Sequence, residues 1–274
     1  HKAIRRQRQM CIRDRTYTET NLRFDKGMWY SLMHHGSFSS SEKETCLSKI
    51  NERIRQGATH LRQSDWLIMT WGTARVYQWK EDGSIVGNCH KLPEKLFERR
   101  LLNVEEIVEQ YRILLPHLRS LNPNLQIIFT VSPIRHAKDG LHGNQLNKAV
   151  LLIAIEKLCN LFSYCHYFPS YEIMMDELRD YRFYADDMLH PSSLAIEYIW
   201  ECFTQTYFSQ NTLHIIKEWD AIRKGLEHRP FNEDSEAYHI FLSQILLKIE
   251  RLKEKLPYLD VQNEIALCQT RLKK

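Results

Sequence analysis

The chain has 274 residues, of which 43% are apolar and 26% charged, and its formal net charge is +4. This length can bury the core of one large domain, or of one domain with an appendage. Residues 1–15 hold six basic side chains and one acidic one, which leaves the remainder with a net charge of −1. A neutral body excludes a basic stripe for nucleic acid, and no apolar run approaches the ~18 residues of a membrane span.

The basic N-terminal stretch, residues 1–15, shows no regular periodicity. Its segment Arg6–Arg15 resembles a translated sequencing adapter, so we expect an extraneous leader and a natural N-terminus that is missing. The alternative is a basic arm that binds an acidic partner.

The chain contains seven cysteines, and none of them forms a C-x-x-C pair. Several lie in apolar helical contexts. This pattern predicts reduced thiols and a cytoplasmic protein rather than a disulfide framework.

Two short apolar runs, 66–70 and 125–131, predict buried parallel strands, and 164–168 is a weaker third candidate. Helical patterns lie between and around these runs, at 42–61, 103–118, 144–161 and 194–208. The alternation of strand and helix predicts a three-layer α/β domain with a parallel sheet.

From about residue 213 the pattern changes to long amphipathic helices, with a corner at 228–231. One apolar stripe contains Phe241, Ile245, Ile249 and Leu252. Such stripes usually pack on their own domain, and partner binding is the alternative. We therefore expect three regions: a leader at 1–15, an α/β domain at 16–210, and a helical extension packed on that domain at 211–274.

Ligand sites of parallel α/β sheets gather at the carboxyl ends of the strands. Three segments should therefore converge, namely Thr70–Tyr77, Ser132–His136 and Asp187–His190. Gly72 and Thr73 can expose backbone N–H groups to a substrate, although a glycine at a strand end equally suits a tight turn.

The segment Tyr184–Ser192 carries the strongest chemical signal. A spacing of three residues brings Asp187 to the same side as His190, where the carboxylate can accept a hydrogen bond from one ring nitrogen. The other nitrogen is then available to take a proton, which is the base-and-orienter half of a hydrolytic triad. Pro191 follows the histidine, and Ser192 or Ser193 can cap the next helix.

A second polar group, Asn88-Cys89-His90-Lys91, lies in the loop after the first strand. The Asn88 amide is suited to donate to an oxyanion, because it presents N–H without carrying charge. Cys89 beside His90 could act as a thiol nucleophile, but adjacent side chains rarely face each other. A metal site built from Asp186, Asp187, His190 and His90 lacks a diagnostic spacing, so we expect no metal.

Taken together, these motifs resemble the GSCFA family, a branch of the SGNH (GDSL-like) hydrolase superfamily. The resemblance covers about residues 27–208 and rests on Gly72-Thr73-Ala74, Asn88 to Lys91, Ser132 to His136, and Asp187 to Ser192. It implies a flavodoxin-like sheet and a Ser-His-Asp hydrolase with His190 as base and Asp187 as its orienter. The helices after residue 208 also look similar to the family's C-terminal extension.

The family's nucleophile would come from a Gly-Ser-Cys-Phe-Ala block after the first strand, and this block is not in the sequence. Gly36-Ser37-Phe38 is a superficial echo without a preceding strand pattern. Ser132 follows a strand, but Pro133 marks it as a turn residue. The superfamily's usual Gly-x-Asn block reads Gly72-Thr73-Ala74 here, so the amide role falls to Asn88.

We therefore predict a serine-dependent esterase that acts on acyl or acetyl esters of a small molecule or glycan, without a cofactor. His190 and Asp187 are the expected catalytic residues, and Gly72, Thr73, Asn88, His90 and Ser132 are the expected oxyanion or substrate-binding residues. Without its nucleophile, the chain as printed should be inactive. The alternatives are an O-acyltransferase on the same triad and a non-catalytic scaffold, and the sequence leaves the oligomeric state open.

Overall fold

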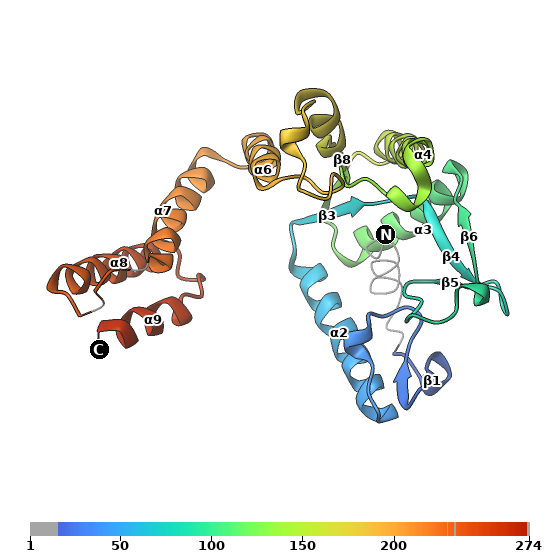
Figure 1. Cartoon of the computed structure of the whole chain (residues 1–274), viewed down its shortest axis with the longest axis horizontal. Helices are drawn as coiled ribbons and strands as arrows, with labels where there is room; N and C mark the ends of the chain where they lie inside the picture. Colours follow the sequence, from blue (N-terminus) through green and yellow to red (C-terminus); the bar gives the residue numbers. More distant parts are fainter. Residues whose placement is uncertain (1–15, 229, 233, 273–274) are drawn as a thin grey trace. The chain divides into compact units, whose positions relative to one another are not determined.

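The computed structural model describes residues 16–228, 230–232 and 234–272. These residues form two compact units, of which the first ends at Ile199 and the second begins at Trp200 (Figure 1). The predicted leader, 1–15, lies outside the described residues. The units are described separately below.

A parallel sheet forms the centre of the first unit. Its strands are β3 (Trp66–Trp71), β7 (Gln126–Val131) and β8 (Cys165–Phe168), in the order β3-β7-β8. Both neighbouring pairs are parallel. All three strands were predicted from their apolar runs, and the α/β class with a parallel sheet is confirmed.

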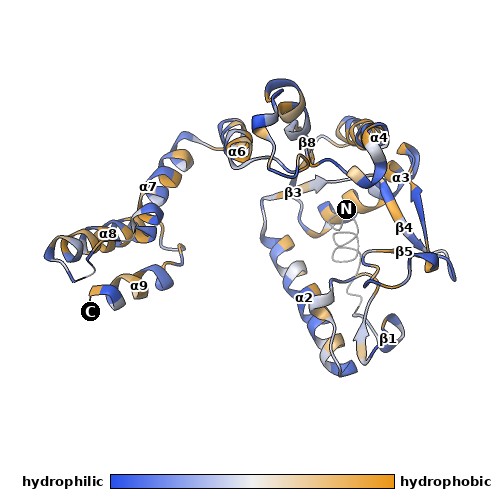
Figure 2. Cartoon of the chain, viewed as in Figure 1, coloured by the Kyte–Doolittle hydropathy of each residue, from blue (hydrophilic) through white to orange (hydrophobic). Residues whose placement is uncertain are grey.

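Three long helices belong to this unit: α2 (Lys43–Gln63), α3 (Val104–Leu121) and α4 (Gly140–Leu161). Asn103 caps α3 and forms the expected capping box with Glu106. The main core lies between the sheet and the pair α3 and α4, where Trp71 and Phe129 pack with their ring centroids 5.1 Å apart. The hydropathy colouring shows orange residues interspersed with blue ones on these helices (Figure 2).

A second sheet, antiparallel, branches from the end of β3. It contains β4 (Arg75–Trp79), β5 (Ile85–Val86) and β6 (Phe97–Leu101), in the order β5-β4-β6. The sequence analysis did not predict it, because its strands are short and rich in arginine, so that no continuous apolar run marks them. A two-stranded hairpin, β1 (Arg23–Asp25) with β2 (Met28–Tyr30), was also missed. It places Trp29 in a strand, although the sequence analysis found no strand pattern before Gly36-Ser37-Phe38.

One face of β3 is open to solvent. Met69 and Trp71 are fully buried on the side of α3 and α4, whereas Ile68, on the opposite face, is 48% exposed. In the part of the chain that the structure describes, β3 is an edge strand of its sheet. A β-branched residue so exposed on an edge strand marks a surface that a further element could cover.

The chain after β8 passes through short helical turns before α6. These are α5 (Ser170–Glu172), η5 (Ile173–Glu177) and η6 (Tyr181–Phe183), and α6 then spans Ser193–Tyr207. Four more 3-10 turns lie earlier in the chain: η1 (Glu19–Asn21), η2 (Gly36–Phe38), η3 (Glu94–Leu96) and η4 (Ala137–Asp139). The predicted helix at 194–208 is thus confirmed with a shift of one residue.

The second unit contains the end of α6 and three helices, α7 (Gln210–Glu227), α8 (Glu236–Lys255) and α9 (Gln262–Leu272). Its own core is built from the apolar sides of these helices and contains Ile245, Ile249 and Leu252 of the predicted stripe. Of the predicted corner at 228–231, residues 228, 230 and 231 lie in the connection between α7 and α8, and residue 229 lies outside the described residues. Packing of this unit on the α/β domain stays a prediction.

Among the described helices, none is long and apolar enough to cross a membrane.

Candidate functional site

Asp187 and His190 form the predicted pair. Oδ2 of Asp187 lies 2.5 Å from Nδ1 of His190, and its Oδ1 accepts the backbone N–H groups of Leu189 at 2.9 Å and His190 at 3.0 Å. These hydrogen bonds to backbone and ring lower the pKa of the Asp187 carboxyl to about 2. The carboxylate is therefore ionised at neutral pH and holds the proton of the imidazole on Nδ1, which leaves Nε2 as the basic nitrogen.

The pair lies on a tight turn that the backbone closes on itself. Tyr184 and Pro191 form an isolated β-bridge, and the N–H of Ala185 donates to the carbonyl of His190 at 2.8 Å. Met188, at the tip, has a φ of +58°, which is unusual for a residue with a side chain. Behind the turn, the hydroxyl of Ser192 accepts the N–H of Ala195, which confirms the expected cap of α6.

The turn, the end of β3 and the end of β7 converge as predicted. The N–H of Ser132 donates to the carbonyl of Trp71 at 2.8 Å, so the residues that follow the two strands are neighbours. Three residues further along, the N–H of Arg135 donates to the carbonyl of Leu189 at 3.1 Å. The loop after β7 therefore joins the Asp187–His190 turn to the carboxyl edge of the sheet, where sites of this fold class form.

Lys148 of α4 lies beneath these strand ends, and the sequence analysis missed it. Its side chain is almost fully buried, and Nζ donates to the carbonyls of Gly72 at 2.7 Å and Ser132 at 2.6 Å. Burial lowers the pKa of this ammonium to about 8. A signal for it was present in the sequence, because the buried stripe of α4 continues toward the N-terminus through Lys148 to Asn144.

His136 makes a second contact with the same strand end. Its Nε2 lies 3.1 Å from the carbonyl of Gly72. Burial and the nearby Lys148 lower the pKa of the His136 imidazole, so the neutral ring donates its Nε2–H to that carbonyl. Lys148 and His136 together fix the backbone of Gly72, and Gly72 is therefore a tightly held position rather than a loose loop.

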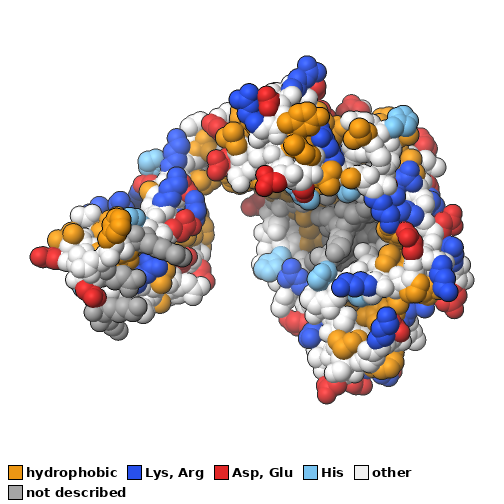
Figure 3. Space-filling model, in the orientation of Figure 1, with side chains coloured by type: hydrophobic (Ala, Val, Ile, Leu, Met, Phe, Trp, Pro, Cys, Tyr) orange, Lys and Arg blue, Asp and Glu red, His pale blue; other side chains and the backbone are white. Residues whose placement is uncertain are grey.

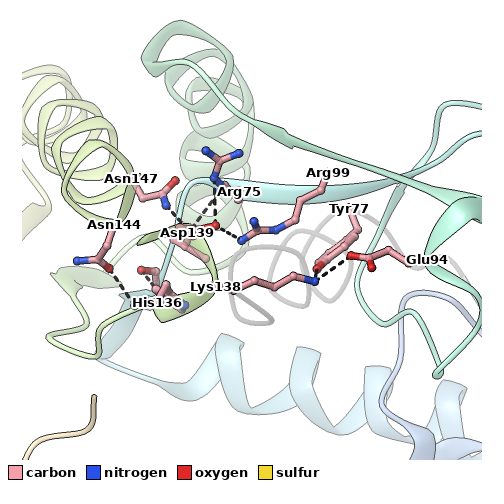
Figure 4. Close-up of polar contacts among 11 residues, drawn as sticks. Arg75, Tyr77, Glu94, Arg99, His136, Lys138, Asp139, Asn144 and Asn147 are labelled. Carbon is pink, nitrogen blue, oxygen red and sulfur yellow. Dashed lines mark hydrogen bonds and ion pairs between the residues drawn. The ribbon is translucent and has the colours of Figure 1, made fainter. Parts of the chain in front are cut away.

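A buried carboxylate joins the antiparallel sheet to the loop after β7 (Figure 4). Asp139 forms ion pairs with Arg75 of β4, at 3.3 Å, and with Arg99 of β6, and it accepts Nδ2 of Asn147 at 2.8 Å. Nearby, Lys138 bridges the Tyr77 hydroxyl and Glu94. These ion pairs hold the loop that carries Arg135 and His136, and the sequence analysis did not identify them.

Thr73 and Ser132 are engaged in local hydrogen bonds. The Thr73 hydroxyl accepts the N–H of Arg75 at 3.0 Å, and the Ser132 hydroxyl accepts the N–H of Ile134 at 3.3 Å. Ser132 is thus the turn residue that Pro133 indicated. Among the described residues, Nε2 of His190 has no hydrogen-bond partner, so neither hydroxyl is placed to give its proton to this nitrogen.

Asn88 and His90 contact an earlier segment of the chain. Nε2 of His90 lies 2.8 Å from the carbonyl of Ser31, and the N–H of Asn88 donates to the carbonyl of Leu32 at 2.8 Å. The side chain of Asn88 accepts the N–H of His90. These contacts give both residues a structural role. Their role at an oxyanion stays a prediction.

Ser37 lies in the 3-10 turn Gly36–Phe38, with its hydroxyl 3.0 Å from Nδ1 of His35. His35 also caps this turn by accepting the N–H of Ser37. The contact is a local cap between residues two apart.

Across residues 16–228, 230–232 and 234–272, no three His, Cys, Asp or Glu side chains gather as a metal site.

An apolar cavity of about 500 Å³ begins beside the end of β3. Thr73 and Ala74 form part of its wall, and Ile107, Tyr111 and Leu114 of α3 form another part. Carboxylates of α3 line it as well, and they are paired with basic side chains, as Glu106 is with Arg100 at 2.7 Å. On the face drawn in Figure 3, basic and acidic side chains are interspersed.

Residues 1–203 match the sequence model of the GSCFA family, and residues 219–274 match the model of the GSCFA domain protein, C-terminal domain. No curated protein and no solved structure gives a match.

Proposed function

The chain belongs to the GSCFA family, and from this membership and the Asp187–His190 contact we propose that it carries the base half of an SGNH-type serine ester hydrolase. The observation that carries the proposal is the 2.5 Å contact between Asp187 Oδ2 and His190 Nδ1. It lies on a turn that is hydrogen-bonded to the loop after β7. A carboxylate that orients a histidine at the carboxyl edge of a parallel sheet is the arrangement that acyl transfer requires.

In the proposed reaction, Nε2 of His190 takes the proton of a serine hydroxyl as that oxygen attacks the ester carbonyl. The imidazolium then gives the proton to the leaving alcohol, and Asp187 stabilises the charged ring throughout. A backbone N–H beside Gly72 donates a hydrogen bond to the oxyanion. Lys148 and His136 hold the carbonyl of Gly72 away from that negative charge. Water completes the cycle, with His190 again acting as base.

The serine is the part that the described residues do not place. We propose that it follows a strand that pairs with β3, which is an edge strand of its sheet among the described residues. In the family this strand precedes the Gly-Ser-Cys-Phe-Ala block. Ser132 is the alternative, and it would require the hydroxyl to leave its bond to the N–H of Ile134.

The substrate we propose is an acyl or acetyl ester of a small molecule or glycan. The cavity that begins at Thr73 has about 500 Å³, which is within the range of pockets that hold small ligands, but its lining contains no residue of the Asp187–His190 turn. The proposed chemistry uses no cofactor. Transfer of the acyl group to a sugar hydroxyl needs the same residues and differs only in the acceptor.

The test compares two proteins: the chain as printed, and the chain preceded by a strand and Gly-Ser block taken from another family member. A fluorophosphonate probe should label the extended protein at the added serine and should leave the printed chain unlabelled. His190→Ala should abolish labelling, while His35→Ala, a histidine in a local cap, should preserve it. Incubation of the extended protein with an acyl ester, with and without a sugar acceptor, separates hydrolase from transferase.

Two outcomes would contradict the proposal. Labelling of Ser132 in the printed chain would place the nucleophile there and make the added strand unnecessary. A folded, extended protein without a reactive serine would favour a binding or scaffold protein that keeps the fold.

A further inference from the structure

Arg135 lies where the loop after β7 meets the Asp187–His190 turn, and the proposed reaction does not use it. Its backbone N–H donates to the carbonyl of Leu189 at 3.1 Å. Its side chain reaches the same turn, with Nη1 donating to the carbonyl of Met188 at 3.3 Å. One residue therefore bonds to two consecutive carbonyls located between Asp187 and His190.

The guanidinium of Arg135 also stacks on an aromatic ring of the same segment. Its central carbon lies 3.9 Å from the ring centroid of Tyr184 and 5.9 Å from that of Tyr181. The shorter distance is a close cation–π contact on the residue that begins the turn. Arg135 thus contacts the turn at its first residue and at its tip.

The tip needs such support because of its backbone. Met188 has a φ of +58°, and its side chain is 49% exposed, so side-chain packing contributes little to holding this conformation. From inside the turn, the Asp187 carboxylate holds the N–H groups of Leu189 and His190. From outside, Arg135 holds the carbonyls of Met188 and Leu189.

We propose that Arg135 is a positioning residue that keeps the Asp187–His190 turn in the conformation in which Nδ1 of His190 faces the carboxylate. The importance of Arg135 for catalysis rests on the proposed function. Its contacts with the turn are present in the chain without a nucleophile. Arg135 acts through Met188, Leu189 and Tyr184 and does not itself touch a reacting atom.

The chemistry of the contact requires arginine. A planar guanidinium can stack on Tyr184 with its face while an edge N–H donates to the carbonyl of Met188. The compact ammonium of a lysine can reach either the ring or the carbonyl, but it lacks the plane that satisfies both at once. Arg135→Lys should therefore restore only part of what Arg135→Ala loses.

The test is NMR of the chain as printed, with histidine ring nitrogens labelled with 15N. A proton held between Nδ1 and a carboxylate at 2.5 Å should give a downfield resonance and an Nδ1–H tautomer for neutral His190. Arg135→Ala should broaden the resonance beyond detection and shift the neutral ring toward the Nε2–H tautomer. Arg135→Lys should give an intermediate tautomer ratio, and hydrogen exchange in β7 should be unchanged in both variants.

The matched control is Arg182→Ala, which removes an arginine from the same region. Arg182 pairs with Asp180 at 3.0 Å rather than with the turn, so its removal should preserve the resonance. Tyr184→Leu removes the stack without removing the guanidinium, and it should weaken the resonance. This variant provides the test if Arg135→Ala does not fold.

Retention of the downfield resonance and of the Nδ1–H tautomer in Arg135→Ala or Tyr184→Leu would overturn the inference. Their loss in Arg182→Ala as well would also overturn it, since the turn would then respond to any local change. These readouts require no reactive serine. Failure of the esterase proposal would show instead in the fluorophosphonate experiment with the resonance intact.

Discussion

At the scale of single residues, Asp187 does most to define the candidate site. Its two oxygens accept three N–H groups: the backbone amides of Leu189 and His190 and the ring nitrogen of His190. An ionised carboxylate can only accept hydrogen bonds, so the ring nitrogen that faces it must carry the proton. This selects the Nδ1–H tautomer of His190. With the pKa of Asp187 at about 2, this acceptor is present at any pH at which the imidazole can act as a base.

Asp187→Asn should preserve the turn and remove the activity. The amide oxygen can still accept the backbone N–H groups, but an NH2 group facing Nδ1 favours the tautomer that leaves no basic nitrogen at Nε2. We expect kcat for ester hydrolysis to fall by roughly 10³–10⁴-fold in the protein that carries the serine. The neighbouring Asp186→Asn is the control and should leave kcat near the parent value. A loss below tenfold for Asp187→Asn would exclude Asp187 as the orienter.

At the scale of elements, the site depends on α4 and on the loops that follow β3 and β7. Lys148 of α4 joins the carbonyls of Gly72 and Ser132, and through them the ends of the two strands. A buried ammonium is costly unless it is hydrogen-bonded, and these carbonyls supply the bonds without a carboxylate. The position of the helix is thereby fixed against the carboxyl edge of the sheet.

Lys148 should leave a signature in the pH dependence of stability. Its pKa is about 8 in the folded chain against an ordinary value of 10.5, so between these values the unfolded state binds more protons. The contribution of Lys148 to the free energy of unfolding should therefore rise as pH increases through this window, by on the order of 3 kcal/mol. Below pH 8 both states are protonated, and the contribution is constant.

The measurement is urea unfolding of the parent and of Lys148→Met at pH 7, 8, 9, 10 and 10.5. Taking the difference between the two proteins removes the contributions of buried cysteines and tyrosines, which titrate in the same range in both. A difference that is flat between pH 8 and 10.5 would show that the ammonium keeps its ordinary pKa in the folded chain.

The loop around Asn88 depends on a close approach of two backbones. A Cβ on Gly87 would lie 2.8 Å from the carbonyl oxygen of Met33, which is closer than real contacts allow. Gly87→Ala should therefore separate this loop from the segment that contains Ser31 and lower the free energy of unfolding by roughly 1–3 kcal/mol. Gly36→Ala is the matched control, because its added Cβ meets nothing within 4 Å. Equal melting temperatures of the two variants would contradict the close approach.

At the scale of the whole molecule, the two regions that match family models correspond approximately to the two compact units. The GSCFA match covers 1–203 and the C-terminal match covers 219–274, while the first unit ends at Ile199 and the second begins at Trp200. Each unit has its own buried core. The distribution of charge does not follow these two units, because the excess of basic residues is confined to residues 1–15.

This charge distribution predicts how the molecule responds to nucleic acid. Any affinity of the printed chain for duplex DNA should depend on residues 1–15 and should be lost in a chain that starts at Thr16, whose net charge is near zero. Fluorescence anisotropy with a labelled duplex at 50 and 200 mM salt measures this. Salt-sensitive binding by the shorter chain would reveal a basic surface on the folded body.

The sequence by itself determined the parts of this protein that depend on neighbours along the chain. The parallel strands follow from apolar runs, α3 from its capping box, and the Asp187–His190 contact from a spacing of three residues, since one turn of backbone brings such side chains together. The tertiary structure alone decided which distant groups support that contact. Lys148 binds a carbonyl 76 residues away and Arg135 one 53 residues away, and the antiparallel sheet is joined to the loop after β7 through Asp139. Periodicity carries no information about such pairs, because they form only when packing of the sheet and α4 brings remote loops to one edge.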